Sequence, residues 1–197
     1  MPASGVRAVK RWGSIYDEFI KISSIFKTVE IHDKHGKLLM TQHLPVEFDG
    51  YPAVFTGRGH LHRLMYEYAV SIGVDVTLGT PISKYIENES GAGVFVGDTK
   101  YEADLVIAAD GVRTQSNIPI SGTERKATKS GVAIYRSWFQ WDSLKDHPLT
   151  EPITRATECG FKVWIGDGRH GIVTYNPFVK HIACYMSHDV CSPGQLD

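Results

Sequence analysis

The chain has 197 residues, 42% of them hydrophobic and 22% charged, so it can bury the core of an ordinary globular protein. Its 21 basic and 22 acidic residues leave a net charge of −1, which argues against a nucleic-acid-binding surface. No apolar run reaches the 20 or so residues of a membrane-spanning helix. Three sparse cysteines favour a reducing, cytoplasmic setting over a disulfide framework.

The first part of the chain mixes helical and strand patterns. Two short helices are expected over residues 4–12 and 15–23, followed by a β-hairpin over 29–40 that turns at 33–36. Residues 45–52 read as a loop. The clearest helix begins near His60 and ends before Gly73, because apolar residues recur there at helical spacing.

Strand patterns dominate the rest of the chain. Three strands are expected over residues 75–85, 94–96 and 101–109, and the apolar run 105–109 predicts a strand covered on both faces. Four more are expected over 131–139, 161–165, 172–175 and 181–186. An α/β region followed by a sheet-rich region is therefore predicted.

Two motifs near the end of the chain suggest chemistry that their context disfavours. Residues 166–171 match Gly-x-Gly-x-x-Gly, but no helix can open before Pro177, so a hairpin turn is predicted. His181, Cys184, His188 and Cys191 are zinc-ligand types at close spacing. Because strand alternation sends His181 and Cys184 to opposite faces, a plain strand is favoured and no metal site is expected.

Two local features point to an anionic or hydroxylated ligand. Arg58 precedes the clearest helix, where a cation meets the positive end of the helix dipole, so it suits a phosphate partner; a solvated loop arginine is the alternative. Asp110 and Gly111 end an apolar strand, where the carboxylate could accept from ribose or ribityl hydroxyls and the glycine permits close approach. An ordinary Asp-Gly turn is the alternative there.

Together these stretches resemble the flavin-dependent aromatic hydroxylases, the group of p-hydroxybenzoate and salicylate hydroxylases. Members carry an arginine ahead of a Leu-His helix start and later an apolar strand ending in Ala-Asp-Gly-Val-Arg. Here these are Arg58 with Leu61 and His62, and residues 109–113. Fungal members are most similar, around residues 26–44 and 134–139. The family's first Gly-x-Gly-x-x-Gly turn and its later Gly-Asp motif are not in this sequence, so the chain resembles an internal fragment.

The resemblance implies an α/β (α+β) fold, with part of a FAD-binding Rossmann-like domain, a three-stranded excursion and a mixed, sheet-rich substrate domain. Residues 1–24 and 51–120 would belong to the FAD-binding domain. Residues 25–50 would form a substrate-domain hairpin, and 121–197 the substrate-domain sheet.

The implied reaction is hydroxylation of an aromatic or related ring, in which NADH or NADPH reduces FAD and O2 supplies the hydroxyl oxygen. By resemblance, Arg58, Asp110 and Gly111 would bind FAD, and Arg113 would lie near the nicotinamide path. Arg136 and His170 would face the ring pocket and orient an anionic or phenolic substrate. No catalytic acid or base is assigned.

Without the Gly-rich turn, we expect the isolated chain to bind FAD weakly or not at all, because the pyrophosphate loses its backbone donors. A catalytically inactive remnant that serves as a binding or dimerisation module is the first alternative, and a zinc-binding tail is the second. A homodimer is compatible with either enzyme or module.

Overall fold

The computed structural model describes residues 1–197 except 90, 112–113, 124–127, 145–146 and 191–197. The chain forms two compact units, Met1–Val74 with Gly131–Asp197, and Asp75–Ser130. The second unit is thus inserted in sequence between the two segments of the first. Each unit is described by itself below.

Three helices of the first unit pack into a small apolar core. They are α1 (Ala3–Lys10), α2 (Ile15–Lys21) and α3 (Arg58–Ser71), close to the three helices that the sequence predicts. Val6 and Val9 lie on one face of α1 and pack with Phe19 of α2, all three nearly inaccessible to solvent. Leu61 and Leu64 bring α3 onto this core.

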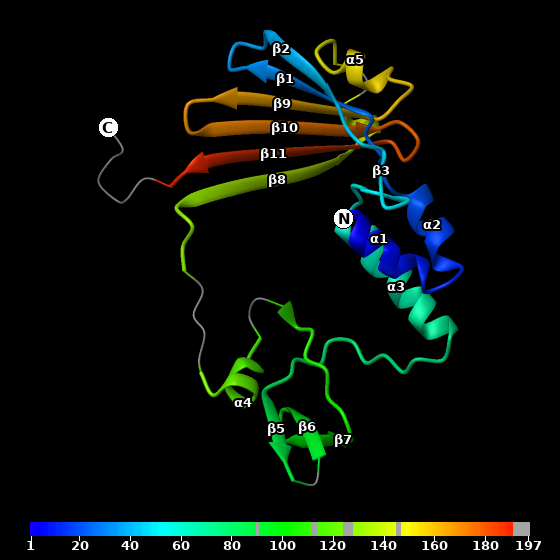
Figure 1. Ribbon diagram of the computed structural model, residues 1–197, viewed down its shortest axis with the longest axis vertical. Coiled ribbons are helices and arrows are strands. Elements are labelled where there is room, and N and C mark those ends of the chain that lie inside the picture. The colour runs from blue at the N-terminus through cyan, green and yellow to red at the C-terminus, as the bar shows by residue number, and fades with distance from the viewer. Residues whose placement is uncertain (90, 112–113, 124–127, 145–146, 191–197) are drawn as a thin grey trace. The chain divides into compact units, whose positions relative to one another are not determined.

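A six-stranded sheet forms the rest of the first unit, in the order β2–β1–β9–β10–β11–β8 (Figure 1). Its strands are β1 (Thr28–Asp33), β2 (Leu38–His43), β8 (Val132–Gln140), β9 (Gly160–Gly166), β10 (Arg169–Asn176) and β11 (His181–Asp189). The predicted hairpin and the four predicted later strands are all confirmed. Only β1 and β9 pair in parallel, and the other neighbours are antiparallel.

Short elements connect the helices and the sheet. Residues 45–52, predicted as a loop, contain two paired two-residue strands, β3 (Glu47–Phe48) and β4 (Tyr51–Pro52). A single helical turn, α5 (Glu151–Thr154), precedes β9. Phe55, which follows β4, contacts Phe26 and Phe161 through ring centroids 5.0 and 5.5 Å apart. These three rings anchor the segment before α3 to the sheet.

The second unit holds an antiparallel sheet in the order β5–β6–β7, which fits the predicted three-stranded excursion. Its elements are β5 (Lys84–Asn88), β6 (Gly91–Val96), β7 (Thr99–Ala103) and α4 (Asn117–Ser121). The first predicted strand therefore begins at Lys84 rather than Asp75.

The predicted strand over 105–109 is wrong: β7 ends at Ala103, and Leu105 and Ile107 are 74% and 80% exposed. A strand needs a neighbour for its N–H and C=O groups, and the described residues pair none with this run. The apolar composition therefore marks a stretch suited to burial that no described strand covers. The described helices include none that is long and apolar enough to span a membrane.

Candidate functional site

A cavity of about 600 Å³ lies in the first unit between the start of α3 and the strands β8 and β11. Residues 56–60 line one side, residues 136–138 and Tyr185 the other. Two residues singled out from the sequence, Arg58 and Arg136, therefore line the same cavity although they belong to different elements.

The start of α3 offers hydrogen-bond donors to this cavity. Gly57 is the N-cap residue and supplies no side-chain cap, while its carbonyl accepts from the Leu61 N–H at 3.0 Å. The first N–H groups of a helix have no intrahelical acceptor. With the Arg58 guanidinium beside them, they form a donor set that suits a phosphate or another anion.

The opposite wall is cationic and aromatic. Arg136 of β8 pairs in register with Tyr185 of β11, and its guanidinium lies 5.8 Å from the centre of that tyrosine ring. Trp138 stands two residues further along the same face of β8. Among the described residues, no carboxylate lines the cavity and none forms an ion pair with Arg58 or Arg136.

His170 shares a sheet face with Arg136 but lies outside this cavity. Its partner in register is Ser187, two residues from Tyr185, and its Nδ1 atom is 3.5 Å from the Ser187 hydroxyl. His170 instead lines an apolar cavity of about 520 Å³ over β9, β10 and β11. The structure thus brings Arg58 and Arg136 together and places His170 apart from them.

Asp110 and Gly111 lie in the second unit, in a turn after the apolar run. The Tyr85 hydroxyl donates to Asp110 Oδ2 at 2.9 Å. Hydrogen bonds from Thr114 and Tyr85 lower the pKa of Asp110. Gly111 has a φ of +81°, in the left-handed region that favours glycine, and its carbonyl accepts from the Thr114 N–H. Arg113 lies outside the described residues.

The glycine-rich motif of residues 166–171 lies in a β-hairpin. Gly166 ends β9, Asp167 and Gly168 form the turn, and β10 begins at Arg169; Gly168 has a φ of +63°, so the predicted hairpin is confirmed. His181, Cys184 and His188 all lie on β11, while Cys191 is outside the described residues. In the part of the chain that the structure describes, no three His, Cys, Asp or Glu side chains form a group that could hold a metal.

One contact beside the cavity escaped the sequence analysis. The rings of His60 and His181 stack, with centroids 5.0 Å apart and planes at 15°. In the sequence, His60 marks the start of the clearest helix, and His181 is a metal-ligand type on a strand. Nothing in their local patterns indicates that α3 and β11 meet here, since the contact depends on the tertiary fold.

Comparisons with known proteins relate this chain to flavin enzymes. No family model matches it. It is 32% identical over 192 residues to asperlicin C monooxygenase of Petromyces alliaceus, covering 94% of this chain and 40% of that protein. It is 31% identical over 169 residues to the FAD-dependent monooxygenase fmqB of Aspergillus fumigatus, covering 84% of this chain and 40% of the relative.

Several solved structures have the same fold as this chain. CtdE in complex with FAD and a substrate superposes with a TM-score of 0.86 at 24% identity, over 98% of this chain and 48% of CtdE. FqzB gives a TM-score of 0.77 at 28% identity, over 99% and 44%. A salicylate hydroxylase substrate complex gives 0.71 at 17% identity, over 100% and 49%.

The chain therefore spans about two fifths of the length of the curated relatives it matches. Within that span the similarity covers nearly all of this chain in sequence and in fold. The resemblance drawn from Arg58 and residues 109–113 is confirmed: over nearly its whole length, the chain is similar to part of the FAD-dependent monooxygenases.

Proposed function

We propose that this chain forms the Arg58–Arg136 cavity of an FAD-dependent monooxygenase that hydroxylates an aromatic or related ring. The observation that carries the proposal is the placement of two arginines without carboxylate partners among the described residues, on opposite walls of one cavity. One wall is a helix start suited to a phosphate, and the other is an aromatic sheet face suited to a ring.

The residues present fit part of FAD. At Gly57, a Cβ atom would lie 3.1 Å from His60 Nδ1 and 3.2 Å from Trp138 Cζ2, so this backbone comes close to the cavity wall. The Arg58 guanidinium and the adjoining N–H groups would hold phosphate or ribityl oxygens. Asp110 is exposed although it accepts a hydrogen bond from Tyr85. With Gly111 beside it, its carboxylate would accept a hydrogen bond from a ribityl hydroxyl. FAD, when bound, supplies the redox chemistry between NADH or NADPH and O2.

The chain's own contribution is to bind and orient. Arg136, placed over Tyr185, would pair with a carboxylate or phenolate on the substrate, while Tyr185 and Trp138 offer ring faces. His170 lies on the same sheet face and would contact a substrate that extends beyond the cavity. We assign the substrate domain to residues 25–50 and 121–197, since they supply all six strands of the large sheet. Residues 1–24 and 51–120 would then belong to the FAD-binding domain.

A flavin titration of the 197-residue protein tests this function. Saturable quenching of flavin fluorescence is expected at high FAD concentrations. Arg58→Ala should weaken FAD binding by about tenfold to a hundredfold, because a hydrogen bond to a charged group contributes about 1.5–3 kcal/mol. Arg63→Ala is the matched control, since Arg63 is a cation of the same helix that forms an exposed ion pair with Glu67. Equal affinities of the Arg58→Ala and Arg63→Ala variants for FAD would contradict the proposal.

One observation favours the alternative of a binding or dimerisation module. Leu105 and Ile107 expose apolar side chains in a run that no described strand pairs. On that alternative, light scattering should show a dimer that the double variant Leu105→Ser, Ile107→Ser converts to a monomer. A monomer in both proteins would exclude a dimer made through this run.

A further inference from the structure

We propose that His60 and His181 are positioning residues: their stacked rings hold the Arg58 end of the cavity against the substrate-facing sheet, and protonation releases them. The proposal deepens the function proposed above, because the cavity that the pair braces is the same one. His60 lies in the first turn of α3, and His181 is the first residue of β11.

The geometry joins the two walls of the cavity. Besides stacking on His60, the buried ring of His181 meets the Trp138 indole edge-on, with centroids 5.2 Å apart and planes at 63°. Trp138 in turn packs close to Gly57, the N-cap residue of α3. The start of the helix is therefore held on the sheet by one continuous set of ring contacts.

Gln140 contacts His181 beside the stack. The Gln140 amide nitrogen lies 2.9 Å from His181 Nε2, so in this arrangement the amide donates and the histidine nitrogen accepts. Protonation of that nitrogen requires the Gln140 amide to turn and present its oxygen instead, which disturbs the side chain next to the stack.

In the two cavities beside the stack, the described residues offer a protonated His181 ring no counter-ion. The charged or titratable groups that line the cavity beside the stack are Arg58 and His60 of α3, Arg136 of β8 and Tyr185 of β11, and Tyr175 of β10 lines a second cavity together with His181. The rung of β10 opposite His181 carries the uncharged Asn176. No carboxylate of the described residues lines this cavity or the one beside His181. Burial, and to a smaller extent the charge of His60, lower the pKa of His181. Protonation of His181 at low pH is therefore expected to weaken its stacking contact with His60.

The sign of the pH effect follows. Since the pKa of His181 is lower in the folded protein, the neutral contact is intact above the ordinary histidine pKa of about 6.5. It is lost as the pH falls below that value, when protons bind. The start of α3 should then separate from the sheet, while contacts of the first unit that do not involve His60 or His181 should persist.

Amide hydrogen exchange, corrected for the intrinsic effect of pH, reports this separation without FAD. The reporter is the Leu61 N–H, which donates to Gly57 in the first turn of α3. The internal control is the Phe55 N–H, which donates to Ser24. Between pH 7.5 and 5.5, Leu61 protection should fall, because protonation of His181 opposes the stack. Phe55 protection should stay constant.

His181→Phe keeps an aromatic ring in the stack but cannot be protonated. It should keep Leu61 protected across this pH range, whereas His62→Phe on α3 should behave as the natural chain. A parallel fall in the natural chain and His181→Phe, or no fall in either, would overturn the proposal. The flavin titration with Arg58→Ala fails or succeeds independently, so the two results separate the positioning role from the flavin site.

Discussion

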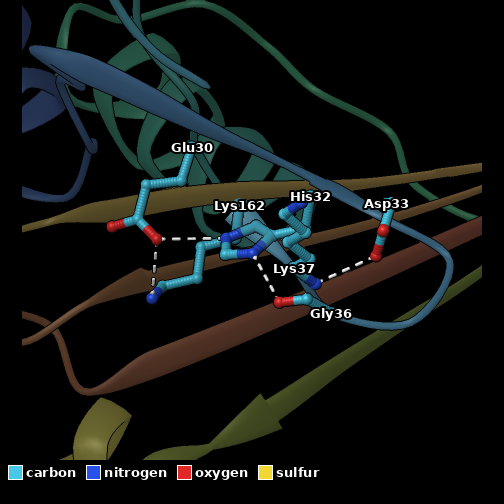
Figure 2. Close-up of polar contacts among 6 residues, drawn as sticks. All are labelled: Glu30, His32, Asp33, Gly36, Lys37 and Lys162. Atoms are coloured by element: carbon cyan, nitrogen blue, oxygen red, sulfur yellow. Dashed lines mark hydrogen bonds and ion pairs between the residues drawn. The ribbon is translucent and has the colours of Figure 1, made fainter. Parts of the chain in front are cut away.

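Lys162 and Glu30 meet across the parallel pair of β1 and β9, with Nζ 3.0 Å from Oε2 (Figure 2). The same carboxylate oxygen lies 3.2 Å from His32 Nε2, and the His32 Nδ1 atom is 3.2 Å from the Gly36 carbonyl. Partial burial acts to raise the pKa of Glu30, but the hydrogen bonds and charges of Lys162 and His32 outweigh it and lower that pKa.

Glu30→Gln should therefore lower the free energy of unfolding at neutral pH. Because the pKa of Glu30 is lower in the folded state, its contribution is present above the ordinary value of 4.5 and is lost as the pH falls below it. The carboxylate is 36% exposed, so the loss should stay below about 1 kcal/mol. Urea denaturation at pH 7 and pH 3 measures it. Glu158→Gln, which removes the exposed pair with Lys27, is the control and should change nothing.

Tyr85→Phe should raise the pKa of Asp110. The variant removes one of the donors that stabilise the carboxylate and leaves the hydrogen bond from Thr114 in place, so the increase should be partial. Carbon-detected NMR titration of the Asp110 carboxyl group measures the change. Tyr101→Phe, at an exposed position on β7, should leave the Asp110 titration as it is. An unchanged pKa in Tyr85→Phe would show that this hydrogen bond does not form in solution.

Gly57→Ala should destabilise the protein by about 1–3 kcal/mol, the usual cost of overpacking. The φ of Gly57 is −67°, which any residue adopts, so the cost comes only from crowding His60 and Trp138. Gly59 has nothing within 4 Å of its Cβ position and lies inside the helix. Gly59→Ala should stabilise by about 0.5–1 kcal/mol through helix propensity. Urea denaturation of both variants checks the opposite signs.

Asn176→Ala should cost about 1–3 kcal/mol, because it leaves several buried polar groups without partners. The Asn176 amide donates to Ser24 Oγ at 2.8 Å, and its Oδ1 atom accepts from the Phe178 N–H at 2.9 Å. Ser24→Ala removes only the first of these and should cost less. Equal losses in thermal denaturation would show that the contacts within the turn after β10 contribute nothing.

Much of the fold follows from local patterns. The helix α3, the hairpin of β1 and β2, and the strands β8 to β11 were predicted, because periodicity and turn residues are read within a few positions. The strand predicted over residues 105–109 was wrong, since the apolar composition of this run indicates only that it is suited to burial. Whether it forms a strand depends on a neighbour that no local pattern describes.

The candidate site divides in the same way. Arg58 was singled out by its charge at a helix start and Arg136 by resemblance, yet nothing in either segment shows that they line one cavity. The stack of His60 on His181 depends on α3 and β11, which are far apart in the chain. Such contacts are set by the sheet order, and the sheet order includes one parallel pairing that sequence periodicity cannot distinguish from an antiparallel one.

That pairing of β1 with β9 also sets an order of events during synthesis. The hairpin of β1 and β2 can close as soon as residues 28–43 have left the ribosome, whereas β1 gains its second neighbour only when residues 160–166 follow. Until then one edge of an early hairpin stays open while the whole Asp75–Ser130 unit is made. Non-local pairing of this kind slows folding and prolongs exposure to aggregation. The yield of folded protein should therefore depend on how quickly β9 arrives.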